Sequence, residues 1–271
     1  MIGTDPLVTS EYDAGVALIR LSHPARRNAW SIELETGYFD LLDRAELDPA
    51  VRVIVLTGSG RHFCPGLDVN RLEAKSRGVP APVRTRPISY PLGVRKPLIA
   101  AINGTTAGVG LVQAVLCDLR FAAAGARFAT SFTRRGLASE HLLSWLLPRL
   151  VGHGNASDLL LSGRVFVAEE AHRMGLVNRV VKADRLLEET IDYARDLAAN
   201  CSPLSMAQVK EQLLGDWLRS PADSLLVSER LTRDERRRAE LAEGVSSLLD
   251  KRPPQFATLP TRAEGTSHAG T

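Results

Sequence analysis

The most informative part of the sequence for the fold is Ala101-Ile102-Asn103-Gly104-Thr105-Thr106-Ala107-Gly108-Val109-Gly110-Leu111. It leads from an apolar strand through a glycine turn into the first turn of a helix. An earlier stretch has the same form, Leu56-Thr57-Gly58-Ser59-Gly60-Arg61-His62-Phe63-Cys64-Pro65-Gly66-Leu67-Asp68-Val69. Each turn presents unpaired backbone N–H groups at the positive end of a helix dipole. Two such turns facing one another predict a site that could hold a developing oxyanion.

The segments around these two stretches alternate between strand and helix patterns. Residues 8–12 and 16–21 flank Asp13-Ala14-Gly15 and predict a hairpin. Ser31 can cap a helix that runs to about residue 47. Apolar runs predict further strands at residues 52–57, 97–102, 119–122 and 127–129. Because these strands alternate with helices, we expect an α/β core that ends near Lys182.

The rest of the chain has a helical pattern. Each expected helix begins beside a capping residue or a proline, and together they cover residues 185–200, 203–218 and 221–249. We therefore divide the chain into a core (1–184), a helical region (185–257) and a disordered tail (258–271). Four prolines and two arginines between residues 79 and 91 predict a mobile surface loop.

Composition excludes several classes of protein. The 271 residues are 44% hydrophobic and 24% charged, close to the average for globular domains. A net charge of +3 is too small to indicate a nucleic-acid or membrane partner. Three widely spaced cysteines exclude a disulfide framework and a Cys-rich zinc site, so no metal is expected. The chain shows neither a signal-peptide pattern at Met1 nor an apolar run long enough to span a membrane, so we expect a cytoplasmic protein.

Several known motifs do not fit. Gly108-Val109-Gly110 matches the start of a dinucleotide-binding fingerprint, but Gln113 occupies the place of its third glycine. A P-loop, a Gly-x-Ser-x-Gly elbow and a His-Glu-x-x-His helix are absent from the sequence. Four other motifs occur in order: His23-Pro24-Ala25-Arg26-Arg27-Asn28-Ala29, Phe63-Cys64-Pro65-Gly66-Leu67-Asp68, Asn103-Gly104 through Gly110 to Cys117-Asp118, and Glu243-Gly244 followed by Lys251-Arg252-Pro253-Pro254-Gln255-Phe256. Together they resemble the crotonase (enoyl-CoA hydratase/isomerase) superfamily over residues 8–257.

The resemblance implies a crotonase-like spiral of ββα units with a helical C-terminal region, assembled as a homotrimer or a dimer of trimers. It implies a coenzyme A thioester as substrate and no separate cofactor. The thioester enolate would accept hydrogen bonds from the backbone N–H groups of Leu67 and Val109. The implied CoA-binding residues are Arg26, Arg27, Ala29, Gly66, Leu67, Asp68, Val69 and Gly108.

Some of these residues have a second interpretation. Arg26 and Arg27 are placed to meet the CoA phosphates, although Arg27 is equally well explained as a surface charge. Asp68 is more easily explained as the cap of a following helix. Val109 replaces the glycine that is commonest in the family, and it would be strained if its backbone required a positive φ.

Two positions depart from the family's hydratases, which use two glutamates to hold and activate water. The matching positions are Val112 and Phe132, both apolar. One acid remains nearby, Glu140, at a spacing that resembles the single catalytic glutamate of Δ3,Δ2-enoyl-CoA isomerases. We expect Ser139 to cap a helix over residues 140–147, with Glu140 in its first turn. An acid at that position is also an ordinary partner of the helix dipole.

A single carboxylate suits an isomerase, because moving a double bond from the 3,4 to the 2,3 position needs one base that removes and returns a proton. We expect Val112, Phe132 and Leu142 to keep water away from Glu140, and we interpret His141 as structural. The sequence therefore predicts an enoyl-CoA isomerase with Glu140 as its base. A hydratase with a rearranged site, or a catalytically idle homologue that binds acyl-CoA or RNA, are the alternatives. The modest charge of the chain argues against the RNA-binding version.

Overall fold

The computed structural model describes residues 6–80 and 82–260, and its strands form two sheets. The first two strands of the larger sheet are antiparallel, and all its other neighbouring strands are parallel. In spatial order, the larger sheet contains β1 (Val8–Asp13), β2 (Val16–Leu21), β3 (Val53–Gly58), β5 (Leu98–Ile102), β7 (Leu119–Ala123) and β10 (Arg179–Val181). The smaller sheet contains β4 (His62–Cys64), β6 (Thr105–Ala107), β8 (Arg127–Ala129) and β9 (Val165–Val167).

The strands follow a pattern that repeats three times along the chain. In each repeat one strand joins the larger sheet, the next joins the smaller sheet, and a helix follows. The repeats are β3–β4 with α2 (Val69–Ser76), β5–β6 with α3 (Val109–Val115), and β7–β8 with α4 (Leu143–Ser162). This arrangement confirms the predicted spiral of ββα units.

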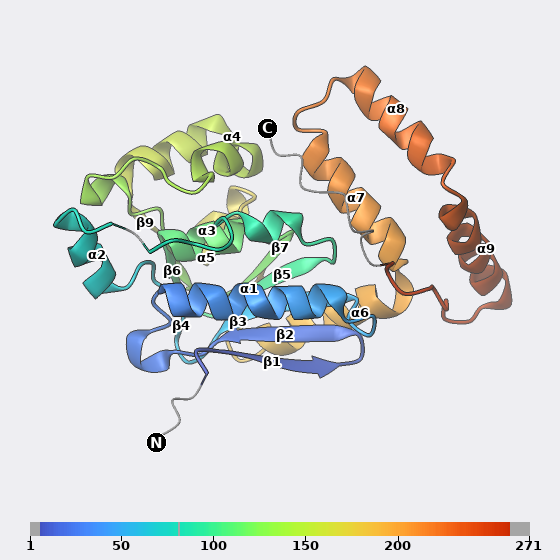
Figure 1. Cartoon of the computed structure of the whole chain (residues 1–271), viewed down its shortest axis with the longest axis horizontal. Helices are drawn as coiled ribbons and strands as arrows, with labels where there is room; N and C mark the ends of the chain where they lie inside the picture. Colours follow the sequence, from blue (N-terminus) through green and yellow to red (C-terminus); the bar gives the residue numbers. More distant parts are fainter. Residues whose placement is uncertain (1–5, 81, 261–271) are drawn as a thin grey trace.

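Two helices cover the larger sheet. Helix α1 (Ile32–Leu47) packs against β1 and β2 and runs alongside β2 in Figure 1. It begins where expected, because Ser31 Oγ accepts a hydrogen bond from Leu34 N at 3.2 Å. Its buried positions include Leu34, Tyr38 and Leu42, which recur at helical spacing. Helix α6 (Leu186–Asn200) packs against β2, β3, β5 and β7. The short α5 (Ala168–Arg173) links β9 to β10.

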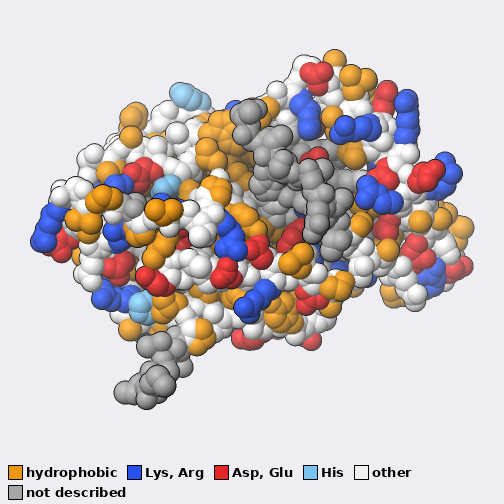
Figure 2. Space-filling view, in the orientation of Figure 1, with side chains coloured by type: hydrophobic (Ala, Val, Ile, Leu, Met, Phe, Trp, Pro, Cys, Tyr) orange, Lys and Arg blue, Asp and Glu red, His pale blue; other side chains and the backbone are white. Residues whose placement is uncertain are grey.

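The last helices form an arm beside this core, made of α7 (Pro203–Gly215), α8 (Pro221–Thr232) and α9 (Glu235–Asp250) (Figure 1). The expectation of one helix over residues 221–249 is wrong. The helix stops at Thr232, and Asp234 starts a new one by accepting a hydrogen bond from Arg236 N at 3.0 Å. On the face of the arm visible in Figure 2, basic and acidic side chains are intermingled. Among the described residues, no helix is both long and apolar enough to cross a membrane.

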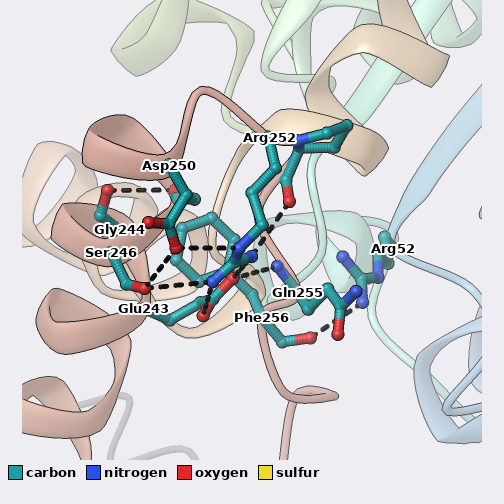
Figure 3. Close-up of polar contacts among 10 residues, drawn as sticks. Arg52, Glu243, Gly244, Ser246, Asp250, Arg252, Gln255 and Phe256 are labelled. Atoms are coloured by element: carbon teal, nitrogen blue, oxygen red, sulfur yellow. Dashed lines mark hydrogen bonds and ion pairs between the residues drawn. The ribbon is translucent and has the colours of Figure 1, made fainter.

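A C-terminal clip, made of Glu243, Arg252 and Gln255, holds the end of the arm (Figure 3). The Arg252 guanidinium donates to both carboxylate oxygens of Glu243, at 2.6 and 2.9 Å, and the backbone N–H of Gln255 donates to Glu243 at 2.5 Å. Arg52 in the core donates to the carbonyl oxygens of Ala198 at 3.1 Å and Phe256 at 2.9 Å. One arginine of the core therefore holds the chain both before and after the arm. Most of the expected disordered tail, residues 261–271, lies outside the described residues.

Ion pairs attach the proline-rich segment 79–91 to α1. Arg86 pairs with Asp40 at 2.8 Å and with Asp43, and Arg84 pairs with Glu35 at 2.8 Å. These contacts join residues more than forty positions apart in the sequence. The segment is thus anchored at its arginines, where the sequence predicted a mobile loop.

Candidate active site

A cavity of about 530 Å³ opens where α2, the two glycine turns and the segment before α4 come together. Its wall contains every site residue that the sequence predicted, although these residues come from four separate parts of the chain. They are Arg26, Arg27, Ala29, Gly66, Leu67, Asp68, Val69, Gly108, Val109 and Glu140. The fold therefore brings these residues together around one space.

The two glycine turns touch each other at this cavity. Gly66 has a φ of +113°, and a Cβ on it would lie 3.1 Å from the carbonyl oxygen of Ala107. Gly108 has a φ of +52°, and a Cβ on it would lie 3.8 Å from Gly66 Cα. A side chain at Gly66 would therefore press on the Ala107 carbonyl, whereas the contact at Gly108 is of ordinary van der Waals length, and both positive φ values favour glycine.

The backbone N–H of Leu67 faces away from its neighbouring chain. Gly66 O accepts from Trp30 N at 2.8 Å, and Asp68 N donates to Trp30 O at 3.0 Å. Since successive peptide groups in an extended chain point in opposite directions, the Leu67 N–H points away from Trp30. Among the described residues, no acceptor is recorded for it.

Val109 is the first residue of α3, so its N–H is one of the helix's unpaired donors. Gly108 takes the positive φ before the helix, whereas Val109 is not among the residues with positive φ. The strain considered for a valine at this position is therefore absent. The N–H groups of Leu67 and Val109 both belong to residues that line the cavity, and together they offer two backbone donors.

Asp68 caps α2, as the sequence predicted. Its Oδ1 accepts a hydrogen bond from Asn70 N at 2.9 Å, while Oδ2 lies 3.4 Å from a terminal nitrogen of Arg26. This leaves Arg26 at the rim of the cavity, with half of its side chain exposed. Arg27 also lines the cavity and is exposed.

Glu140 does not lie in a helix, so the expected cap at Ser139 is wrong. Helix α4 begins at Leu143, after His141 and Leu142 adopt left-handed backbone conformations with φ of 57° and 64°. The hydroxyl of Ser139 is buried and has no partner among the described residues. Glu140 instead extends to the cavity from a non-helical segment, which removes the interpretation that it serves a helix dipole.

The surroundings of Glu140 are more polar than expected. Its Oε1 lies 2.6 Å from Lys75 Nζ at the end of α2, and its Oε2 lies 3.7 Å from His141 Nε2. Its side chain is 32% exposed. Burial lowers the pKa of His141 from its usual 6.5, although Glu140 opposes this shift. The imidazole is thus predominantly neutral at neutral pH.

The apolar residues expected around Glu140 are largely elsewhere. Val112 is fully buried in the core of α3 and is not part of the cavity wall, and Leu142 is 44% exposed. Only Phe132 lines the cavity. Water exclusion by these three side chains together was therefore a wrong expectation.

Backbone strain gathers at this site. Seven described residues other than glycine have a positive φ, and five of them border the cavity or adjoin residues that do: Arg27, Asn28, Ser131, His141 and Leu142. Such conformations are uncommon and persist where surrounding structure enforces them, often at functional sites. Asn28 illustrates this, since its Nδ2 donates to the carbonyl oxygens of Ser59 and His62 at 2.9 and 2.8 Å.

Trp30, Lys75 and Arg84 are among the cavity residues that were not predicted from the sequence. Trp30 Nε1 donates to Glu35 Oε2 at 2.8 Å, and Arg84 Nε donates to Glu35 Oε1 at 2.8 Å. Glu35 lies on the buried face of α1 with only 3% of its side chain exposed. The sequence did contain a signal for this cluster. Glu35 lies on the same helical face as the apolar Leu34 and Tyr38, and a carboxylate buried there needs hydrogen-bond donors or a cation as partners.

The remaining residues considered from the sequence have structural contacts. Burial raises the pKa of Cys64 to about 12, so its thiol is inert at neutral pH. Asp118 accepts hydrogen bonds from Leu98 N and Lys210 Nζ, both at 2.7 Å, as a structural acceptor should. Gln113 is buried and donates to Ile88 O at 3.2 Å. Within the described ranges, no group of three or more His, Cys, Asp or Glu side chains could hold a metal ion.

The repeated ββα units and the paired glycine turns define a crotonase-fold protein. The sequence model of the enoyl-CoA hydratase/isomerase family matches residues 11–259, and the chain belongs to that family. It is 34% identical over 258 residues to the 1,2-epoxyphenylacetyl-CoA isomerase of Escherichia coli, covering 92% of this chain and 97% of that one.

Solved structures agree with this assignment. An enoyl-CoA hydratase from Polaromonas is 31% identical with a TM-score of 0.84, and the match covers 92% of this chain and 99% of that one. An enoyl-CoA hydratase from Mycobacterium marinum is 48% identical with a TM-score of 0.69, and the match covers 79% of this chain and all of that one. The chain is therefore an acyl-CoA enzyme by family.

Proposed function

We propose that the protein is an enoyl-CoA isomerase that moves a double bond from the 3,4 to the 2,3 position, with Glu140 as its base. The observation that carries the proposal is a cavity whose wall contains two unpaired backbone N–H groups and the carboxylate of Glu140, which is paired with Lys75 at 2.6 Å and remains 32% exposed. The other acid in the described cavity wall, Asp68, is occupied by the cap of α2 and by Arg26.

The proposed reaction needs one base that transfers a proton and two hydrogen bonds to the thioester oxygen. Glu140 removes a proton from C2 of a 3-enoyl thioester, and the electron pair moves onto the carbonyl oxygen to give a dienolate. The N–H groups of Leu67 and Val109 stabilise that negative oxygen, the kind of interaction that is worth about 100- to 1,000-fold in rate. The carbonyl then re-forms, the double bond moves to C2–C3, and Glu140 returns the proton at C4.

The CoA moiety is assigned to the rim formed by Arg26 and Arg27. Guanidinium groups suit phosphates because they offer several donors in a plane and remain charged. The side chain of Arg26 is half-exposed, and among the described residues its ion pair is with Asp68 at 3.4 Å, so it can reach a phosphate without leaving a buried partner.

Hydration of a 2-enoyl thioester is the second candidate. The names of the relatives favour it, since the Polaromonas and Mycobacterium marinum structures are both described as enoyl-CoA hydratases. Against it stands the chemistry of the site, because Val112 and Phe132 provide no second carboxylate to position water. The two reactions have different substrates and products.

Separate incubation with 3-enoyl-CoA and 2-enoyl-CoA distinguishes them. We expect isomerisation of the first to exceed hydration of the second. Glu140→Gln should lower isomerisation by about 100- to 10,000-fold, with little change in acyl-CoA affinity. Glu73→Gln is the matched control, because Glu73 is an exposed acid on α2 that pairs with Arg77. Full turnover by the Glu140 variant would assign the proton transfer to another group, and faster hydration would favour the hydratase.

We also propose assembly as a homotrimer or a dimer of trimers. Large apolar side chains exposed on the arm support it, including Leu225, Leu226, Leu241 and Leu248. Apolar surface of this extent is costly to leave in water. Light scattering of the purified protein should give three or six times the monomer mass of 29.4 kDa, and a monomer would contradict the proposal.

A further inference from the structure

Arg84 is held in place at the cavity wall by a buried carboxylate. Its Nε donates to Glu35 Oε1 at 2.8 Å, and the other oxygen of Glu35 accepts from the Trp30 indole at 2.8 Å. Only 3% of the Glu35 side chain is exposed, whereas 32% of Arg84 is. The base of the guanidinium is therefore fixed, while the group itself reaches the cavity.

The two terminal nitrogens of Arg84 have no recorded acceptor among the described residues. Its neighbour Arg86 uses both of its terminal nitrogens, one on Asp40 and one on Asp43. Unlike Arg86, Arg84 therefore has both terminal nitrogens unpaired among the described residues. These two nitrogens are the ones that can bind a carboxylate through two parallel hydrogen bonds.

This guanidinium lines the same cavity as Glu140 and His141, whereas the CoA phosphates are assigned to Arg26 and Arg27. The charges of Arg84, Lys75, Glu140 and Glu35 all act on His141, which agrees with a shared location. Lys75 stands seven residues along α2 from Asp68, the partner of Arg26. At about 1.5 Å per residue, this separates the two residues by about 10 Å.

The charges near Arg84 permit another negative group. Lys75 neutralises Glu140 across 2.6 Å, and Glu35 neutralises Arg84. Arg135, also in the cavity wall, donates to the carbonyl oxygen of Ser131 at 3.2 Å. The positive charge of Arg135 has no carboxylate partner among the described residues.

We propose that the cavity takes CoA thioesters whose acyl chain ends in a carboxylate, and that Arg84 binds this carboxylate. The inference rests on the proposed function, because it takes the CoA moiety to lie at Arg26. An alkyl end group would remove water from the terminal nitrogens of Arg84 and offer them no acceptor, which disfavours its binding. A carboxylate satisfies them with charge-assisted hydrogen bonds.

The test is a binding comparison that needs no turnover. Glutaryl-CoA and pentanoyl-CoA have acyl chains of equal carbon number, and neither contains a double bond to move or hydrate. Isothermal titration calorimetry should show glutaryl-CoA binding about 10- to 100-fold more tightly, as expected for a charge-assisted pair.

Variants assign the preference to Arg84. Arg84→Gln alone would leave Glu35 buried without its cation, so the double variant Arg84→Gln with Glu35→Gln is the main test. It should bind the two thioesters about equally while retaining its thermal stability. Arg86→Gln is the matched control, because Arg86 anchors the same segment to α1 without lining the cavity, and it should keep the preference.

Equal binding of the two thioesters by the wild-type protein would overturn the inference. So would a preference that survives in the double variant. Absence of binding of both thioesters would instead contradict the proposed function itself. Loss of isomerisation with the glutaryl preference intact would contradict only the assigned reaction.

Discussion

Replacing Gly66 with alanine tests whether contact between the two glycine turns places the backbone donors. Gly66 has a φ of +113°, and an added Cβ would meet the Ala107 carbonyl oxygen at 3.1 Å. The left-handed backbone costs alanine about 1–2 kcal/mol. Relieving the contact moves the carbonyl that directly precedes Gly108 and Val109, so the two N–H groups separate. The contact is relieved by a shift of a few tenths of an ångström. Since a displacement near 1 Å costs about 100-fold in rate, this smaller shift should cost about 10-fold.

Gly125→Ala provides the matched control. Gly125 has a φ of +75°, but a Cβ there would have no heavy atom within 4 Å. Both variants should lose about 1–2 kcal/mol in the free energy of unfolding, measured by denaturant titration. Only Gly66→Ala should lose about 10-fold in kcat/KM for isomerisation. Equal kcat/KM values for the two variants would refute the argument that the touching turns position the donors.

Three other predictions follow from single contacts. Arg26→Ala should weaken acyl-CoA binding at low salt. The difference from wild type should shrink at high salt, because salt screens the attraction between an exposed arginine and the CoA phosphates. Calorimetry at two ionic strengths measures the two affinities. The Arg252 side chain lowers the pKa of Glu243 to about 2, so the clip stabilises the fold above about pH 4.5 and loses this contribution as the pH falls toward about 2. Thermal unfolding of Glu243→Gln should accordingly show less dependence on pH in that window. Cys64, whose pKa burial raises to about 12, should resist alkylation by iodoacetamide in the folded protein, and rapid labelling of that residue by mass spectrometry would contradict its buried placement.

Features set by neighbouring residues were predicted well from the sequence. The hairpin around Ala14, the cap at Ser31 and the cap at Asp68 all depend on groups a few positions apart. The residues of the motifs around Gly66 and Gly108 lie together at one cavity.

Features set by distant residues were not predicted. Ser139 has the composition of a helix cap, yet the two left-handed residues after it delay the helix to Leu143. Nothing in the local pattern indicates that conformation. The position of Arg84 depends on Glu35, which is 49 residues away in the sequence. Such pairs become visible only once the chain has folded.

The two hydrogen bonds of Arg52 have a consequence for how the arm can vary in length. Because one guanidinium binds the carbonyl oxygens of both Ala198 and Phe256, the arm is a closed loop of nearly sixty residues. The entropy of closing a flexible loop grows only with the logarithm of its length, so even a doubling adds about 0.6 kcal/mol. Insertions or deletions at the tip, near residues 232–235, would therefore be inexpensive in closure entropy. Replacement of Arg52 would remove both of these hydrogen bonds in a single step.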